Sequence, residues 1–378
     1  MVVGNDFLPA AIFLSPRAKN YEDPVTVATR ETVIWHDQMR RAFALAKKGP
    51  LVNENPRVGC VLVTDHGVVV AEGFHRGAGT DHAEVDALTR LRAKGIPSRG
   101  LTAVVSLEPC RHEGRTPPCA KGLVEAGVSR VVYSVSDPGG DSAQGSQYLV
   151  DHGVEVIGGV LADEGLDVIR HWHTATTLGR PFVTVKWAQS LDGRLAASDG
   201  SSQWITSPES RSLVHTDRSH HGAIVVGTET ALVDDPSLTA RTDDGDLYPS
   251  QPHAVVIGMR EIPAGAKLHD HPAGFSHFPT HDVGAVLTEL FARGIRSCYV
   301  EGGATLIAAF VTAGLVDEYH LTMGPMLLGG DKVAITDIGV GSLSDAKHLD
   351  FVDLFVTGGD IRVVARPSDH TPQPAKEA

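Results

Sequence analysis

The sequence contains no apolar run long enough to cross a membrane, which takes about 20 consecutive apolar residues in a helix. The apolar run nearest its start, residues 7–14, is far too short, and no basic residue precedes it as in a secretory signal. Repeats at a fixed period are also lacking, which excludes a solenoid. We therefore expect a soluble protein that contacts no membrane.

Basic residues and cysteines are scarce. Lys and Arg number 33 against 46 Asp and Glu, so the net charge is −13. Proteins that bind nucleic acid gather basic side chains to neutralise phosphates, so this balance argues against a nucleic-acid partner and favours a small molecule. The four cysteines are Cys60, Cys110, Cys119 and Cys298. Without a secretory signal they indicate reduced thiols in the cytoplasm, where metal binding is more common than disulfide formation.

The length and composition of the chain are sufficient for two domains. The chain of 378 residues exceeds the usual size of one domain, and its 42% hydrophobic and 21% charged residues are ordinary for a globular protein. The break at Gly179-Arg180-Pro181 predicts the boundary between the domains. We therefore expect an N-terminal extension over residues 1–32, a first domain over 33–179, a second domain over 180–367 and a polar tail over 368–378.

Strands alternate with helices in both halves of the chain. In the first half, the hydrophobic pattern predicts helices near residues 35–48, 81–94, 119–126 and 162–177. Strands are predicted near 59–63, 68–71, 103–107, 131–134 and 154–157, with a surface loop over 137–147. In the second half, strands are predicted near 182–188, 223–226, 254–257 and 297–300. This alternation predicts an α/β fold in which helices cover both faces of a sheet.

The first domain carries a possible metal site. His82-Ala83-Glu84 is followed by Pro109-Cys110 and by Cys119. Zinc with three protein ligands keeps one position for water and lowers the pKa of that water to about 7. We predict that His82, Cys110 and Cys119 are the zinc ligands. Glu84 is then the acid/base that moves the proton, because His-x-Glu followed by Pro-Cys-x-x-Cys is the signature of zinc deaminases.

Two alternatives to this interpretation remain open on the residues alone. His112, Cys60 or His75 could supply a fourth ligand and close the site into a structural one, although such a site has no need of an adjacent glutamate. A deaminase of nucleosides or nucleic acid is the other alternative. Eight residues separate the two cysteines here instead of two, which argues against it.

The segment between Cys110 and Cys119 indicates which kind of deaminase this is. Residues 107–119 read Leu-Glu-Pro-Cys-Arg-His-Glu-Gly-Arg-Thr-Pro-Pro-Cys, and they follow the motifs Asn55-Pro56-Arg57-Val58-Gly59, Gly73-Phe74-His75 and His82-Ala83-Glu84-Val85. With these motifs the chain resembles the bifunctional deaminase/reductase family of riboflavin biosynthesis, over about residues 37–366. The resemblance implies a cytidine-deaminase-like three-layer α/β/α domain. It also implies that Asn55 and His75 hold a pyrimidine edge and that Arg115 reaches the ribose phosphate or the pyrimidine.

The second half carries further motifs of the same family, at residues 180–194, 202–206, 226–228, 234–241 and 300–306. This likeness implies a dihydrofolate-reductase-like α/β domain that uses NADPH. The residues implied to contact NADPH are Ala188, Trp204, Thr230, Asp234, Gly303, Ala304, Thr305, Leu306, Ile307, Ala308 and Ala309. Those implied to contact the substrate are Ser202, Arg218, Leu238, Arg241 and Glu301.

Residue chemistry supports an acid/base role in this half. Lys186, Asp234 and Glu301 are the titratable candidates. Arg218 and Arg241 suit a phosphate, because guanidinium binds it bidentately. The alternative is that Lys186 only forms a structural ion pair, with Asp192, Asp234 or Glu301 as its partner.

A glycine pair is the candidate phosphate site. Gly302-Gly303 follow a predicted strand and open a predicted helix, where free backbone N–H groups would face a phosphate. The pair is not the G-x-G-x-x-G pattern of a Rossmann fold and is also compatible with a tight turn. Gly258-Met259 stands where the family usually has an Asp-Ser pair, so the resemblance carries over no cofactor contact at this position.

Together the motifs predict two consecutive reactions. The resemblance implies hydrolysis of the 2-amino group of 2,5-diamino-6-(5-phosphoribosylamino)pyrimidin-4-one, with release of ammonia. NADPH-dependent reduction of the ribosyl side chain then gives 5-amino-6-(5-phosphoribitylamino)uracil. The resemblance also implies a homo-oligomer that associates through the reductase domain. The rival hypotheses are a nucleoside or nucleic-acid deaminase with an unrelated partner domain, and a structural zinc-binding module.

Overall fold

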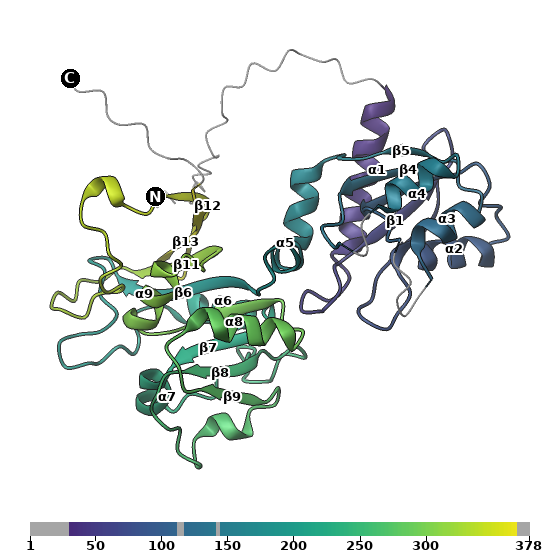
Figure 1. The fold of residues 1–378 in the computed structure, drawn as a ribbon. Coiled ribbons are helices and arrows are strands. Elements are labelled where there is room, and N and C mark those ends of the chain that lie inside the picture. Colours follow the sequence, from purple (N-terminus) through teal and green to yellow (C-terminus); the bar gives the residue numbers. More distant parts are fainter. Residues whose placement is uncertain (1–29, 112–116, 141–143, 369–378) are drawn as a thin grey trace, which may run out of the picture.

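The computed structural model describes residues 30–111, 117–140 and 144–368. Figure 1 shows two α/β units, with the helix α5 (Ala162–Leu178) between them. Arg115, His112 and most of the predicted extension and tail lie outside the described residues. Within the described ranges, no helix is both long enough and apolar enough to cross a membrane.

A five-stranded sheet forms the first unit, with its strands in the order β2-β1-β3-β4-β5. β1 pairs antiparallel with β2 and β3, whereas β3, β4 and β5 are parallel. The strands are β1 (Gly59–Val63), β2 (Val69–Phe74), β3 (Thr102–Leu107), β4 (Arg130–Val135) and β5 (Glu155–Ile157). The helices that accompany α5 are α1 (Arg30–Ala46), α2 (Ala83–Ala93), α3 (Cys119–Glu125) and α4 (Gly145–Asp151).

Helices cover both faces of this sheet, because successive side chains of its strands point to opposite sides. Cys60 and Leu62 of β1 pack with α2, α3 and α4, while Val61 and Val63 pack with α1 and α5. The predicted α/β fold is therefore confirmed. Gly73 allows α2 to lie directly on β2, since a Cβ there would come within 2.4 Å of the backbone nitrogen of Ala87.

The helix α4 corrects one prediction. A loop was expected over residues 137–147, but α4 begins at Gly145. Its Gly-Ser start has no helical hydrophobic pattern. The helix is instead stabilised by tertiary contacts, with Leu149 fully buried in the core shared by α2 and α3.

An eight-stranded sheet forms the second unit, in the order β12-β13-β11-β6-β10-β7-β8-β9. The pairs from β11 to β9 are parallel, and β13 and β12 add to β11 as an antiparallel hairpin. The strands are β6 (Phe182–Ser190), β7 (Ala223–Gly227), β8 (His253–Ile257), β9 (Phe275–Phe278), β10 (Ser297–Val300), β11 (Glu318–Gly324), β12 (Leu349–Thr357) and β13 (Asp360–Pro367). The helices are α6 (Pro208–Ser219), α7 (Thr228–Asp234), α8 (Val283–Ala292) and α9 (Ala304–Thr312), with short 3₁₀ turns η1 (Lys267–Asp270) and η2 (Leu343–Asp345).

The central strands of the second sheet have one apolar and one polar face. Val183 and Val185 of β6 belong to a core that also contains residues of α8 and α9. The alternating residue Lys186 points to the other face, where the sheet register places His320 of β11 directly beside it. Arg218 of α6 binds Glu301 on this face. The polar face is therefore the one covered by α6, and it carries the charged side chains.

Candidate active sites

His82, Cys110 and Cys119 come together in the first unit. His82 precedes α2, Cys110 follows β3, and Cys119 begins α3, so three elements contribute one side chain each. Their ligand atoms all lie within 4.8 Å of one another. His82 Nδ1 is 3.2 Å from Cys119 Sγ and 3.6 Å from Cys110 Sγ. A tetrahedral zinc ion, with Zn–S and Zn–N bonds of about 2.3 and 2.0 Å, separates its N and S ligands by roughly 3.5 Å, so the group fits zinc.

One thiol of this group, that of Cys110, is prepared for metal binding, whereas the hydrogen bond with Cys110 and burial raise the pKa of the Cys119 thiol. The hydrogen bond with Cys119 lowers the pKa of the Cys110 thiol to about 4, and His82 adds to the effect. Thiolate is the form that binds metals. Within the described part of the chain, no fourth His, Cys or carboxylate joins the three at that distance. Cys60, one alternative fourth ligand, lies in the core between β1 and α2.

Glu84 lies in the first turn of α2 and is only 4% exposed. Burial raises the pKa of its carboxyl group, and the adjacent Cys110 thiolate adds to this rise. A carboxyl group with a raised pKa can both accept and release a proton near neutral pH. Glu84 lies two residues after His82, and the raised pKa of its carboxyl group suits a residue that shuttles protons.

His75 and Asn55 form a fixed pair close to the metal ligands. The rings of His75 and His82 lie 5.3 Å apart. His75 Nδ1 donates to the carbonyl of Asp81 at 3.0 Å, which leaves Nε2 to accept from the Asn55 amide at 3.1 Å. Burial lowers the pKa of His75, so the ring is neutral. The structure thus brings both predicted pyrimidine-binding residues to the metal group.

Glu108 is a buried residue that the sequence analysis did not single out. Its Oε1 accepts hydrogen bonds from the Ser146 hydroxyl and N–H at 2.7 and 3.0 Å, and its Oε2 accepts from the Asp137 N–H at 3.2 Å. These bonds tie the segment before Cys110 to β4 and α4. A carboxylate two residues before a ligand, directly after an apolar strand, was the available signal for this role.

Lys186, Glu301 and Arg218 meet on the polar face of the second sheet. Arg218 binds Glu301 bidentately at 2.6 and 3.0 Å, and Lys186 Nζ lies 3.6 Å from Glu301 Oε2. Burial opposes ionisation of Glu301, but Arg218 and Lys186 outweigh it and lower its pKa to about 2. Burial also lowers the pKa of Lys186, although the negative charge of Glu301 raises it. Of the three partners considered for Lys186, Glu301 is the one that the structure places beside it.

The other residues predicted to bind substrate or cofactor differ in exposure. Trp204 is 64% exposed, and the Arg211 guanidinium lies 4.3 Å from its ring centre. Leu238 is only 3% exposed and packs into a core with residues of β7 and β8, so its side chain faces away from solvent. Exposed are Ser202, Asp234 and Arg241, and half-buried are Ala188 and Thr230. Partial burial raises the pKa of Asp234.

The carboxyl ends of β6, β10, β7 and β8 meet at one edge of the sheet, because these strands are parallel. Open α/β sheets bind ligands at this edge. α9 begins there after Gly302, with Gly303 as its N-cap, a residue that has no side chain to bond the first N–H groups. A Cβ at Gly303 would meet no atom within 4 Å. Ile307, further along, is fully buried, whereas Gly303 and Thr305 near the beginning of the segment are exposed.

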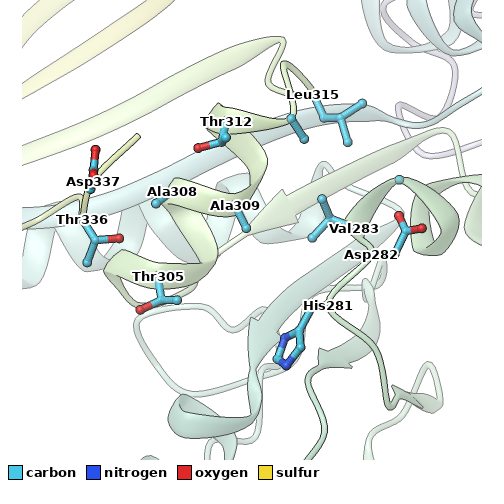
Figure 2. Close-up of a pocket in the computed structure, with 12 residues that line it drawn as sticks. His281, Asp282, Val283, Thr305, Ala308, Ala309, Thr312, Leu315, Thr336 and Asp337 are labelled. Atoms are coloured by element: carbon cyan, nitrogen blue, oxygen red, sulfur yellow. The ribbon is translucent and has the colours of Figure 1, made fainter. Parts of the chain in front are cut away.

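A cavity of about 550 Å³ lies beside the same helix (Figure 2). Thr305, Ala308 and Ala309 of α9 line it together with residues at the start of α8. The carboxylates of Asp282 and Asp337 also line it. Because these acids repel phosphate, we expect the phosphates of a dinucleotide at the beginning of α9 and not in this cavity.

Fold and site define a class of protein, namely a zinc-type deaminase unit joined to an α/β reductase unit. Comparison with protein families supports both parts. Residues 34–135 match the cytidine and deoxycytidylate deaminase zinc-binding region, and residues 181–363 match the RibD C-terminal domain.

Known relatives identify the family. The riboflavin biosynthesis protein RibD of Mycobacterium tuberculosis is 43% identical over 307 residues, which cover 81% of this chain and 89% of that protein. RibD of Escherichia coli is 37% identical over 361 residues, covering 85% and 96%. The crystal structure of the diaminohydroxyphosphoribosylaminopyrimidine deaminase/5-amino-6-(5-phosphoribosylamino)uracil reductase of Thermotoga maritima matches with a TM-score of 0.79 and 33% identity, covering 89% of this chain and 100% of that one. The chain belongs to the RibD family of bifunctional deaminase/reductase enzymes of riboflavin biosynthesis. The family and fold class predicted from the sequence are confirmed.

Proposed function

We propose that the first unit hydrolyses 2,5-diamino-6-(5-phosphoribosylamino)pyrimidin-4-one to 5-amino-6-(5-phosphoribosylamino)uracil and ammonia. His82, Cys110 and Cys119 hold the zinc ion. The observation that carries the proposal is the cluster of these three ligands with the buried Glu84 at the first turn of α2. When bound, zinc acidifies a water and so supplies a nucleophile near neutral pH.

The residues around the metal transfer the proton and bind the substrate. Glu84 accepts the proton of the attacking water and delivers it to the departing amino group, which its raised pKa permits. His75 is held in one tautomer by Asp81, and its Nε2 accepts from the Asn55 amide. His75 therefore orients Asn55, whose amide oxygen and second N–H can bind the pyrimidine edge. Arg115 is assigned to the ribose phosphate on the family likeness.

The deaminase proposal is tested with Glu84→Gln. We expect ammonia release from the diaminopyrimidine to fall by a factor of about 10² to 10⁴, the usual contribution of a general acid/base. Zinc content should stay at one ion per chain, because the glutamate is not a ligand. Ammonia release at the wild-type rate would contradict the role of Glu84. X-ray absorption that counts four protein ligands, with no light-atom water ligand, would instead support a structural zinc site.

The second unit, on this proposal, reduces the ribosyl side chain of the deaminated product with NADPH. When bound, NADPH supplies the hydride. The first N–H groups of α9, beginning at Gly303, receive one of its phosphates. Lys186 exchanges the proton needed at the opened sugar, and Glu301 holds Lys186 in place. Arg241 is exposed and free to bind the substrate phosphate, whereas Arg218 already binds Glu301 and Thr239.

Lys186→Met tests the reductase half. We expect NADPH oxidation with the deaminated substrate to be lost, while ammonia release from the diaminopyrimidine continues at the wild-type rate. The second activity of the same chain thus reports that the variant is folded. Normal NADPH oxidation by the variant would refute the role of Lys186.

Domain limits and cellular setting complete the proposal. We assign the deaminase domain to residues 33–179 and the reductase domain to 180–367, flanked by an extension over 1–32 and a tail over 368–378. The substrate is a small phosphorylated pyrimidine, and the acidic net charge of −13 supports the absence of a nucleic-acid partner. We place the enzyme in the cytoplasm, without membrane contact, because its zinc-binding thiols must stay reduced.

The edge strand β12 is the surface proposed for association into a homo-oligomer. The register with β13 places Leu349, Phe351, Leu354 and Val356 on the same side as the apolar core. All four are exposed, with Phe351 at 70%. An uncovered apolar edge strand is a template for pairing with another strand. A second copy of the same surface fits it, because a symmetric dimer brings identical patches together.

A further inference from the structure

The last turn of α6 is attached to the neighbouring strand β10 by two consecutive side chains. Arg218 binds Glu301, as described above. Asp217, the residue before it, accepts a hydrogen bond from the Tyr299 hydroxyl at 3.0 Å. Tyr299 and Glu301 are two positions apart and therefore lie on the same side of the sheet. The position of Arg218 over Glu301 thus depends on how Asp217 is held.

Asp217 is held by more than Tyr299. Its carboxylate also binds the guanidinium of Arg362 from β13. His320 Nδ1 of β11 lies 3.3 Å from the same carboxylate oxygen. The backbone carbonyl of Asp217 accepts from His221 Nδ1 at 2.7 Å. Side chains from three strands therefore converge on one residue of α6.

These contacts belong to a larger buried network. Arg362 is 3% exposed, and it also contacts His320 Nδ1 at 2.7 Å. His320 Nε2 lies 2.8 Å from Glu318 Oε1, and Arg366 binds the other oxygen of Glu318 at 2.9 Å. The carboxylates of Asp217 and Glu318 thus neutralise the guanidinium groups of Arg362 and Arg366. Removing one partner of such a buried set leaves an uncompensated charge, which is costly.

The network reaches the proposed reductase site from the side opposite Glu301. His320 lies beside Lys186 in the register of β11 and β6. Asp217, Glu318 and His320 also line a cavity of about 410 Å³ that is bordered by Asn55 and by α5 of the first unit. Water from this cavity can therefore reach the network.

We propose that Asp217 is a positioning residue of the reductase reaction, which holds Arg362 and the last turn of α6 so that Arg218 and Glu301 are aligned with Lys186. The inference rests on the proposed reductase function. Asp217 does not touch the reacting atoms in this scheme. It acts through Arg218 on one side and through Arg362 on the other.

The charge of Lys186 gives a readout that distinguishes positioning from simple stability. Burial lowers the pKa of Lys186; Glu301 raises it, and Arg218 and Arg362 lower it further. His320 is the remaining titratable neighbour, on β11. Burial lowers the pKa of His320, but Asp217 and Glu318 outweigh this and raise it. Without the Asp217 carboxylate, Arg362 loses its ion-pair partner and lowers the pKa of Lys186 further, while His320 keeps Glu318 as the partner that favours its charged form.

The test compares Asp217→Asn with the wild-type full chain. We expect KM for the deaminated substrate to rise about tenfold or more, because Glu301, which the family likeness places against the substrate, is then no longer aligned by Arg218. The limb of the pH profile of kcat that belongs to Lys186 should move to lower pH. Ammonia release from the diaminopyrimidine should stay at the wild-type rate, which shows that the chain is folded. Asp217→Glu, which keeps the charge, should recover most of the activity.

Asp331→Asn is the matched control, since it removes one carboxylate from an exposed position of the same unit. It should change neither KM nor the pH profile. An unchanged KM and pH profile in Asp217→Asn would overturn the inference while leaving the proposed function intact. If the wild-type chain itself fails to oxidise NADPH with this substrate, the proposed function fails instead. If ammonia release falls together with NADPH oxidation, Asp217 has only a structural role and the inference is again overturned.

Discussion

Buried carboxyl groups show how residue environment separates two kinds of chemistry in this chain. Glu84 is buried among thiols, so its pKa is raised, and it can carry a proton. Glu301 is partly buried but faces Arg218 and Lys186, so its pKa falls to about 2 and it stays ionised. The same side chain therefore acts as a proton shuttle in one site and as a fixed anion in the other.

Glu108 leads to a prediction at the residue scale. Its carboxylate accepts three hydrogen bonds that fix the segment before Cys110. We expect Glu108→Ala to reduce zinc affinity by a factor of about 10 to 100, the usual effect of losing a group that orients metal ligands. Competition with a chelator, followed by metal analysis, measures this. Glu125→Ala, an exposed position at the end of α3, is the control and should leave affinity unchanged.

At the scale of elements, α5 joins the two units through a histidine contact. His171 stacks on Phe182 of β6 at 4.4 Å and lies 5.0 Å from His221. Burial lowers the pKa of His171 to about 3 and that of His221 to about 4. The unfolded chain binds these protons from about pH 6.5 downward, whereas the folded chain does not. Stability therefore falls as the pH drops from about 6.5 towards 4.

This linkage gives a second prediction. His171→Phe keeps the stacking on Phe182 but removes one titrating group. We expect the loss of unfolding free energy between pH 6.5 and 4.5 to become shallower, by at most about 1.4 kcal/mol per pH unit. Urea unfolding followed by tryptophan fluorescence, to which Trp172 of α5 contributes, measures it. His66→Phe in the exposed β1–β2 turn should leave the slope as in the wild type.

The start of α9 gives a third prediction, because it separates helix stability from cofactor binding. Aspartate at a helix N-cap stabilises the helix but repels a phosphate at the same place. We expect Gly303→Asp to weaken NADPH binding about tenfold or more without lowering the melting temperature. Gly303→Ala is the matched control, since its Cβ meets no atom within 4 Å. Equal NADPH affinity in both variants would show that no phosphate binds there.

At the scale of the whole molecule, the uncovered edge of the second sheet predicts self-association. Phe351→Asp places a charge in the proposed contact between two copies, so we expect the sedimentation coefficient to fall to that of a monomer. Val68→Asp puts the same charge on an exposed apolar position of the first unit and serves as the control. A wild-type chain that sediments as a monomer at micromolar concentration would contradict the proposed dimer.

The grouping of His82 with Cys110 and Cys119 and the family could be predicted from the sequence because their signals are local, while the roles of these residues and of Glu84 stay predictions. His-x-Glu and Pro-Cys are short motifs, and the strands of both units show continuous apolar runs bounded by Gly and Pro. The start of α4 could not be predicted, because Leu149 stabilises this helix through contacts with distant elements. The role of Glu108 was missed for the same reason, since its partners follow it by 29 and 38 positions.

The sequence by itself determined the chemistry of the first unit and the α/β class of both units. Both follow from local features, namely short motifs and the periodicity of hydrophobic residues. Only the tertiary structure decided which charges meet on the polar face of the second sheet. Glu301, the partner of Lys186, comes from a different strand, and Asp217 and Arg362 are separated by 145 positions. Such pairings depend on strand order and on which face of the sheet a residue occupies, and these are set by the packing of the whole unit.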